Sequence, residues 1–142
     1  MTFISTEIPQ PEAKANRGKL LRDGFVYTEC YTDIGGLNIT GGSAILDCLC
    51  NLTANEMFDE RGNIREGVVQ TVTDGVVRLA KGFKLLIVVT NEVASDGVCH
   101  ADGVAAYRQA LCAINRELAL RADCVYELCV AIPTAIKGTL MI

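Results

Sequence analysis

The sequence predicts one α/β domain over residues 1–142, with a mainly parallel sheet and flanking helices. Strand-like runs alternate with helix-like segments along the chain, which is the order that produces parallel sheets. Two of these runs are almost wholly apolar, as is typical of parallel strands covered on both faces. Hydrophobic residues make up 50% of the chain and charged residues only 21%, so a buried core can form.

The N-terminal part is expected to place a charged helix between two short strands. Residues 1–6 (MTFIST) form a β-type run, and residues 25–30 (FVYTEC) alternate apolar and polar residues as a half-buried strand does. Residues 11–23 between them are compatible with a helix, because Pro11 suits a first turn and Gly24 suits a stop.

A glycine-rich loop, residues 35–43 (GGLNITGGS), precedes an apolar segment, residues 44–50, and a short helix over residues 52–59. The loop imitates the phosphate-binding pattern G-x-x-x-x-G-K-[ST], but Gly42 stands in place of its lysine. It also leads into a strand, whereas a phosphate loop needs a helix N-terminus behind it. We therefore interpret this segment as a flexible connection.

The second half is expected to alternate two helices with two buried strands. Asn63 is expected to cap the first helix. Apolar residues recur along it every three to four positions: Ile64, Val68, Val72, Val76 and Leu79. Residues 84–90 (KLLIVVT) follow as a strand, residues 102–122 as the second helix and residues 124–132 as a second buried strand. Pro133 is expected to end that strand before a short tail that could run antiparallel.

Charge and composition argue against two classes of partner. Thirteen Lys and Arg oppose seventeen Asp and Glu, a net charge of −4, so no nucleic-acid polymer is expected as a partner. The longest apolar runs fall well short of the roughly 20 residues of a membrane span. The N-terminus shows no secretory signal pattern. We expect a cytoplasmic protein with no membrane span.

The seven cysteines are expected to be reduced and mostly buried as small hydrophobic residues. Their odd number and the lack of a signal pattern argue against a disulfide framework. No C-x-x-C pair occurs and His100 is the only histidine, which does not favour a conventional zinc site. The pair Cys99–His100 is the one alternative, as a thiolate nucleophile beside an imidazole.

Polar residues follow the predicted strands at the sheet edge where open α/β sheets bind ligands: Thr6-Glu7, Glu29, Asp47 and Thr90-Asn91-Glu92. Asp47 ends an apolar run, either as an acidic residue that holds Mg²⁺ directly or through water, or as a plain turn or cap aspartate. Thr90, Asn91 and Glu92 follow another apolar run, as part of an active site or as a plain loop entry. If the two strands are parallel neighbours, Asp47 and Glu92 converge on one rim.

One face of the predicted helix over residues 102–122 carries Arg108, Cys112 and Asn115, spaced four and three residues apart. Such a face could meet an anionic ligand or a neighbouring subunit. The residue types alone leave both interpretations open.

Four motifs occur in a specific order: AILDCLCNLTANEMF from Ala44, IVVTNEV from Ile87, YRQALCAINRELALRAD from Tyr107 and VYELCVAIPTAIKG from Val125. They resemble L-[DE]-C-[LI]-[ST]-x-[LM]-x-x-N, V-V-T-N-E-V-G, a helix F/Y-R-x-x-x-G-x-x-N-Q/R-x-L-A-x-x-A-D, and a strand running into G-[IL]-P-x-x-x-K. Together the chain resembles the bifunctional adenosylcobinamide kinase / adenosylcobinamide-phosphate guanylyltransferase family of cobalamin biosynthesis.

The resemblance implies a P-loop NTPase-like (RecA-like) fold, a homo-oligomer, and Mg²⁺ with GTP or ATP. Two reactions are implied: phosphorylation of a hydroxyl of adenosylcobinamide, and transfer of GMP from GTP to the resulting phosphate. Asp47 would hold Mg²⁺ and take part in catalysis together with Glu92. The matching nucleotide- or substrate-binding positions are Asn55, Asn91, Arg108, Asn115 and Lys137.

Two parts of that family's machinery have no counterpart in this sequence. The chain begins at what resembles the second strand, so the first strand and its G-G-x-x-S-G-K-S phosphate loop are missing. Asn16-Arg17 stands in the place of the guanylate-accepting histidine, and an amide cannot replace imidazole as the nucleophile. Ala94 and Cys112 replace two glycines. We expect impaired or absent activity of this chain alone, with a non-catalytic corrinoid- or nucleotide-binding relative as the alternative.

Overall fold

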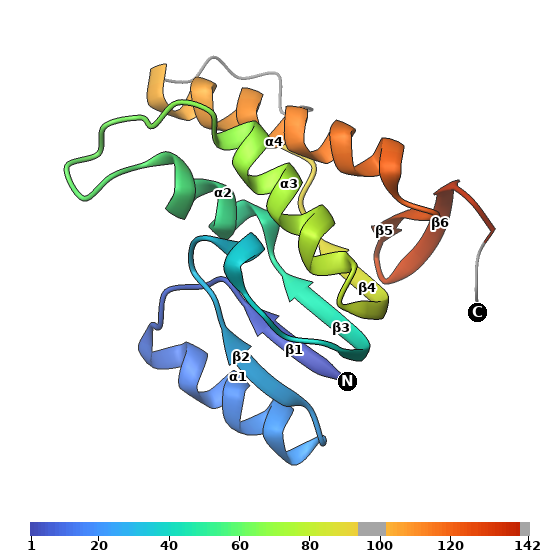
Figure 1. Ribbon diagram of the computed structural model, residues 1–142. Coiled ribbons are helices and arrows are strands. Elements are labelled where there is room, and N and C mark those ends of the chain that lie inside the picture. Colours follow the sequence, from blue (N-terminus) through green and yellow to red (C-terminus); the bar gives the residue numbers. More distant parts are fainter. Residues whose placement is uncertain (94–101, 140–142) are drawn as a thin grey trace.

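The computed structural model describes residues 1–93 and 102–139, without the side chains of residues 11–14. Six strands, four α-helices and one 3₁₀ turn follow one another within these residues (Figure 1). Their order is β1 (Thr2–Ser5), α1 (Pro11–Arg22), β2 (Val26–Glu29), η1 (Ile34–Gly36), β3 (Gly41–Asp47), α2 (Leu49–Met57), α3 (Val68–Ala80), β4 (Phe83–Val89), α4 (Asp102–Arg121), β5 (Val125–Cys129) and β6 (Ile132–Lys137).

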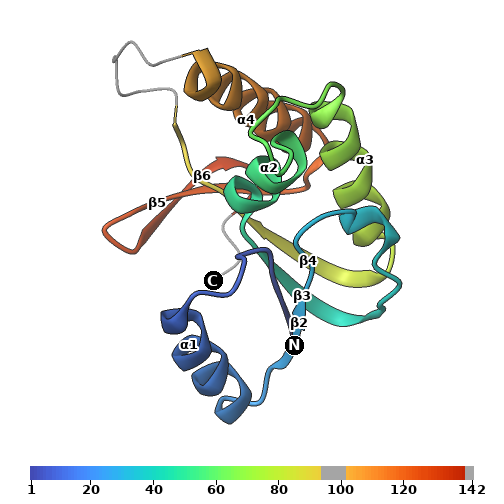
Figure 2. The ribbon, with the colours of Figure 1, turned by 90° about the vertical axis from the view of Figure 1, so that its left-hand side faces the viewer.

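The main sheet has four parallel strands in the order β2-β1-β3-β4. Helices α2, α3 and α4 lie on one face of this sheet, and α1 lies beside β2 on the other (Figures 1 and 2). The predicted α/β class with a mainly parallel sheet and flanking helices is therefore confirmed. The strand boundaries differ from the predicted ones by one to three residues.

The core lies between the sheet and helices α2, α3 and α4. Strands β1 and β3 contribute the fully buried Ile4, Ala44 and Leu46. The helices contribute Leu49, Leu52, Val72, Val76, Leu79, Leu111 and Ile114, all at most 3% exposed. The apolar spacing predicted for α3 is confirmed from Val68 to Leu79, while Ile64 lies before the helix and is exposed. Burying a large aliphatic side chain contributes about 1.5–3 kcal/mol, so this layer dominates the stability of the fold.

The start of α3 differs from the prediction. Asn63 does not cap it: the helix begins at Val68, with Gly67 as its N-cap at φ +75°. Instead, the backbone N–H and Nδ2 of Asn63 donate hydrogen bonds to the Asp59 carboxylate at 2.8 and 3.0 Å. Asn63 thus closes a turn, and a glycine enters the helix because it tolerates a positive φ.

Two glycines allow α3 to cross the η1 turn at close range. A Cβ atom on Gly75 would lie 2.7 Å from Ile34 Cγ2 and 3.1 Å from the backbone N of Gly35. The glycine-rich loop therefore has a packing role at Gly35. It leads into a strand, as predicted, but β3 begins at Gly41, inside the segment predicted as loop.

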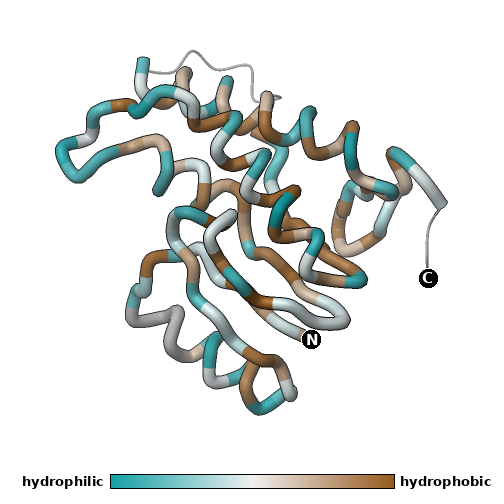
Figure 3. Tube along the Cα trace, viewed as in Figure 1, coloured by the Kyte–Doolittle hydropathy of each residue, from teal (hydrophilic) through white to brown (hydrophobic). Residues whose placement is uncertain are grey.

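Strand β4 is parallel, as predicted, but the expectation that both its faces are covered was wrong. It is the edge strand of the described sheet, and Leu85, Ile87 and Val89 are 43%, 42% and 38% exposed. Their partly buried neighbours Leu86 and Val88 pack against the core instead. Strand β4 is largely hydrophobic (Figure 3), and its exposed Leu85, Ile87 and Val89 make its outward face an apolar surface.

The predicted buried strand over residues 124–132 was also wrong. Strand β5 ends at Cys129 and pairs antiparallel with β6 in a hairpin that is separate from the main sheet. Pro133 lies inside β6, opposite Leu128, instead of ending the strand. The antiparallel tail is confirmed. Apolar residues of this hairpin remain exposed because no helix or sheet covers them within the described residues.

Candidate functional site

The carboxyl ends of three neighbouring strands are aligned in register. Ser5 of β1 pairs with Asp47 of β3, which pairs with Val89 of β4. Strands β3 and β4 are therefore parallel neighbours, and Glu92 follows β4 by three residues. The half-buried Asp47 and the exposed Glu92 leave adjacent strands at one edge of the sheet.

Thr6 fixes the backbone at the end of β3. Its fully buried hydroxyl donates to the carbonyl of Cys48 at 2.7 Å and lies 3.1 Å from the carbonyl of Asp47. The same oxygen accepts a hydrogen bond from the Cys48 N–H at 2.9 Å. Because the Asp47 backbone is held from β1, its carboxylate is presented from a rigid support.

Helix α4 fixes the residues that follow β4. Asn115 Oδ1 accepts a hydrogen bond from the Thr90 hydroxyl at 2.7 Å, and Asn115 Nδ2 donates to the Asn91 carbonyl at 3.2 Å. Arg108 Nε, about two helical turns earlier, donates to the Val93 carbonyl at 2.7 Å. The helix face predicted to meet a ligand or a subunit therefore contacts the chain at the edge of the sheet.

The first turn of α2 brings two thiols to this edge. Cys48 is the N-cap of α2, and Cys50 lies two residues later in the first turn. The neighbouring Cys48 thiol, together with Asn91 and Thr90, lowers the pKa of Cys50 to about 6 against the effect of burial. The Cys50 thiol and burial raise the pKa of Cys48. Tyr107 Oη donates to the Cys50 carbonyl at 3.1 Å, and burial and the Cys50 thiol raise the pKa of Tyr107 to about 12.

Asn55 makes backbone contacts at the same edge. Its Nδ2 donates to the carbonyls of Thr6 at 2.9 Å and Tyr31 at 3.0 Å. The side chain therefore ties α2 to the ends of β1 and β2.

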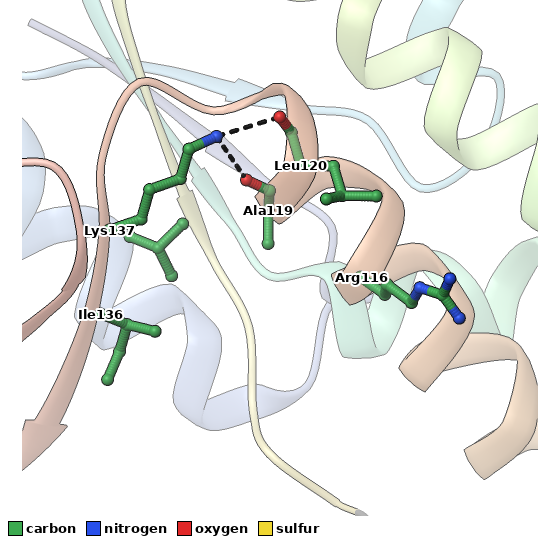
Figure 4. A pocket seen from close by; sticks show the side chains of 6 residues that line it. Arg116, Ala119, Leu120, Ile136 and Lys137 are labelled. Atoms are coloured by element: carbon green, nitrogen blue, oxygen red, sulfur yellow. Dashed lines mark hydrogen bonds between the residues drawn. The ribbon is translucent and has the colours of Figure 1, made fainter.

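Lys137 lies away from this edge, at the far end of α4. Its Nζ donates to the carbonyls of Ala119 at 3.1 Å and Leu120 at 3.0 Å (Figure 4). The helical rise of about 1.5 Å per residue places Ala119 about 16 Å along α4 from Arg108. Lys137 closes the C-terminus of the helix, and the structure does not bring it together with Asp47 and Glu92.

The position of the family's histidine lies on α1. Asn16 is exposed there, and Arg17 lies over the Tyr27 ring at 5.1 Å from its centroid and 3.6 Å from the Glu29 carboxylate. Glu29 ends β2 in register with Ser5.

Residues 17–136 match the family described as cobinamide kinase / cobinamide phosphate guanyltransferase. The chain belongs to this family. The match spans most of the chain and every candidate site residue except Lys137. Among curated proteins, none gives a significant match. The four-stranded parallel sheet with flanking helices is consistent with the P-loop-like fold of the cobinamide kinase family, which acts in cobalamin biosynthesis.

A magnesium ion, which the family implies, fits the donors at the edge. Mg²⁺ is commonly held by one or two carboxylates together with substrate phosphates and water. Asp47 and Glu92 supply carboxylate oxygens, and the Asp47 backbone is already held by Thr6. The described residues contain no group of three or more His, Cys, Asp or Glu side chains that could bind a metal without such a substrate.

Sequence reasoning missed Cys50 and Tyr107 at this edge. Thr6 was expected at the end of the first strand, but its hydrogen bonds to the end of β3 were not predicted. Thr6 follows β1 as Asp47 ends β3, so the shared register was the available signal. The cysteines are less buried than expected, since Cys48, Cys50 and Cys112 are half-buried and Cys129 is exposed. The Cys99–His100 pair and Ala94 lie outside the described residues. No helix within the described ranges is long and apolar enough to cross a membrane.

Proposed function

We propose that the carboxyl edge of the sheet binds a Mg²⁺–nucleotide, GTP or ATP, for phosphoryl and guanylyl transfer to adenosylcobinamide or its phosphate. The single observation that carries this proposal is the register of β3 and β4, which puts Asp47 and Glu92 at one edge. Membership of the cobinamide kinase family supports the choice of substrate. We propose a cytoplasmic location, where GTP and ATP are available.

Each edge residue has a proposed role that its chemistry supports. Asp47 holds Mg²⁺, directly or through a bound water, and Glu92 orients a metal-bound water or the attacking hydroxyl. When bound, Mg²⁺ would neutralise phosphate charge. Asn91 and Arg108 face the nucleotide, and Asn115 positions the segment after β4. Asn55 and Lys137 are proposed as two further binding residues; Asn55 lies at this edge, and Lys137 lies at the other end of α4.

We propose further that this chain alone turns over slowly. Phosphoryl transfer depends on positioning and charge neutralisation, which a lysine-bearing phosphate loop largely supplies. The segment that imitates such a loop carries Gly42 in place of the lysine and enters β3. A non-catalytic relative that binds nucleotide or corrinoid is the second candidate, and the amide at Asn16 favours it for the guanylyl transfer step.

Calorimetric titration with GTP, ATP and cobinamide tests these proposals. We expect nucleotide binding that requires Mg²⁺ and that weakens about tenfold, or about 1.4 kcal/mol, in Asp47→Asn. Asp74→Asn is the matched control, because Asp74 lies on α3 and bonds only locally with Gln70 at 2.6 Å. Cobinamide binding without nucleotide binding would favour the non-catalytic relative. Rapid transfer of labelled phosphate to cobinamide by the chain alone would contradict slow turnover.

We also propose that the chain forms a homo-oligomer through the edge of β4. An unpaired, apolar edge strand is a template for pairing with another chain, and the outward side chains of β4 are exposed. Light scattering coupled to gel filtration should give a mass of at least two chains for the wild type and of one for Leu85→Lys/Ile87→Lys. Leu21→Lys on α1, at a similarly exposed site, should leave the mass unchanged. A monomeric wild type would contradict this interface.

A further inference from the structure

The last residues of the three neighbouring strands β2, β1 and β3 form a polar row at the carboxyl edge of the sheet. Ser5 pairs with Glu29 on one side and with Asp47 on the other. Paired residues of parallel strands direct their side chains to the same face of a sheet, and adjacent strands lie about 4.8 Å apart. Ser5 is therefore the direct neighbour of Asp47, in the middle of the row.

This row lies on the face of the sheet opposite to α2, α3 and α4. The residues that precede Ser5 and Asp47 are Ile4 and Leu46, and both are fully buried in the core on the side of these helices. Successive side chains of a strand alternate between the two faces, so Ser5 and Asp47 belong to the other face. Helix α1 lies beside β2 on that second face (Figure 2). A ligand bound by Asp47 therefore meets the sheet on the side of α1.

The Ser5 side chain is buried, but its hydroxyl is not used within the protein. The residue is 7% exposed, and its hydroxyl has no hydrogen-bond partner among the described residues. The hydroxyls of Thr53 and Thr73 also lack partners, but they are fully enclosed, whereas that of Ser5 is not. A buried polar group that is left unpaired costs free energy. A ligand at Asp47 can reach the Ser5 hydroxyl and supply the missing hydrogen bond.

We propose that Ser5 is a further ligand-binding residue, whose hydroxyl donates a hydrogen bond to a phosphate oxygen of the Mg²⁺–nucleotide at Asp47. The inference rests on the proposed function, because it takes that ligand from it. A serine hydroxyl carries a proton that it can donate, whereas an ionised carboxylate only accepts hydrogen bonds. Ser5 is therefore the member of the row that can bind a phosphate oxygen directly.

Glu29, the other neighbour of Ser5, is already compensated by groups of its own. The Tyr31 hydroxyl donates to Glu29 Oε2 at 2.7 Å, and Arg17 Nη1 lies 3.6 Å from Glu29 Oε1. The charge of Asp47 is balanced by the Mg²⁺ that it holds in the proposed function. A phosphate oxygen beside Ser5 thus lies between two carboxylates whose charges are both opposed by cations.

Calorimetric titration of Ser5→Ala with GTP and ATP in the presence of Mg²⁺ tests the proposal on the whole chain. We expect the dissociation constant to rise about tenfold, because a hydrogen bond to a charged group is lost. The midpoint of urea unfolding should stay at the wild-type value, because no partner in the protein loses a hydrogen bond. Ser43→Ala is the matched control: Ser43 lies on the same strand and face as Asp47, but four residues, or about 13 Å, before it. Its nucleotide binding should equal that of the wild type.

The outcomes separate this inference from the proposed function. A wild type that binds no nucleotide in the presence of Mg²⁺ would overturn both. If Asp47→Asn weakens binding while Ser5→Ala binds as tightly as the wild type, only the role of Ser5 is overturned. A Ser5→Ala variant that is less stable as well as weaker in binding would show a structural role for the hydroxyl and would also overturn the inference. An equal loss of affinity in Ser43→Ala would have the same consequence, because the effect would not be specific to the strand end.

Discussion

The hydroxyl of Thr90 donates a 2.7 Å hydrogen bond to Oδ1 of Asn115, and so the middle of α4 is joined to the end of β4. Asn115 also contacts the next residue of the chain, because its Nδ2 donates a hydrogen bond to the Asn91 carbonyl. The position of Glu92 relative to Asp47 is therefore controlled from a helix that lies beyond it in sequence. Asn115 of α4 therefore holds the segment that follows β4 at the edge of the sheet.

Asn115→Ala should lower the free energy of unfolding by about 1 kcal/mol, because two partly exposed hydrogen bonds are lost at about 0.5–1.5 kcal/mol each. It should also weaken Mg²⁺-dependent nucleotide binding several-fold. Urea denaturation and calorimetric titration measure the two effects. Gln109→Ala, an exposed change on the same helix, should stay within about 0.5 kcal/mol. Equal free energies of unfolding for the two variants would show that the hydrogen bonds of Asn115 do not stabilise the fold.

Two buried threonines should respond oppositely to the same substitution. Thr6→Val removes the hydroxyl that lies within hydrogen-bond distance of the Asp47 and Cys48 carbonyls and of the Cys48 N–H. The Cys48 N–H is left without its partner, so we expect the free energy of unfolding to fall by about 1–3 kcal/mol. The buried hydroxyl of Thr53 has no hydrogen-bond partner among the described residues, so Thr53→Val should be neutral or stabilising. Denaturant unfolding of both variants measures their free energies of unfolding. A decrease in Thr53→Val as large as that in Thr6→Val would contradict the prediction.

Two helical glycines should also behave differently. Gly75→Ala brings a methyl group against Ile34 and Gly35, and the overpacking should cost about 1–3 kcal/mol despite the better helix propensity of alanine. At Gly18 on α1, the side chain atom that a Cβ would meet among the described residues is Arg22 Nη1 at 3.6 Å, an ordinary contact distance, so Gly18→Ala should stabilise by about 0.5–1 kcal/mol. Thermal unfolding monitored by circular dichroism compares them. A higher melting temperature for Gly75→Ala would show that the η1 turn moves away to accommodate the added methyl group.

The local sequence was sufficient to predict the parts of the fold that depend on hydrophobic periodicity. The stripe of α3 follows from the spacing of residues such as Val72 and Val76. The parallel pairing of the apolar strands follows from their alternation with helices along the chain. Periodicity cannot distinguish a central apolar strand from an edge strand, and for that reason Ile87 was expected to be buried. The hairpin of β5 and β6 depends on contacts made by Pro133 and its partner Leu128, which apolar content does not reveal.

The candidate site shows the same division. The position of Asp47 at a strand end was predictable, because a carboxylate after an apolar run marks the edge of a parallel sheet. The contribution of Cys50 was not, because Thr90 and Asn91 after β4 and Tyr107 of α4, which act on its thiol, lie far along the chain. Lys137 was expected at the site from resemblance alone, and it lies at the other end of α4.

Alkylation of Cys50 should depend on pH in a way that shows the effect of the neighbouring Cys48 thiol on its pKa. The thiolate is the reactive form, and its fraction rises with pH and reaches one half at the pKa. The pKa of Cys50 is lowered from 9.0 to about 6, so iodoacetamide should reach half of its maximal rate near pH 6, and the thiol should be mostly ionised at pH 7. Cys30 is the internal control, because burial and the carboxylates of Asp33 and Glu56 raise its pKa, so its rate should still be rising at pH 9.

Cys48→Ala removes the largest cause of the Cys50 shift, and the midpoint should move up toward 9. Cleavage before Asp47 and Asp59 releases residues 47–58, and mass spectrometry of this peptide follows the rate of alkylation at Cys50 in both proteins. Fragment ions distinguish alkylation of Cys50 from alkylation of Cys48 in the wild type. A wild-type midpoint near 9 would show that the neighbouring Cys48 thiol does not lower the pKa of Cys50. An unchanged midpoint in Cys48→Ala would assign the shift to Asn91 and Thr90 instead, because their contacts survive the substitution.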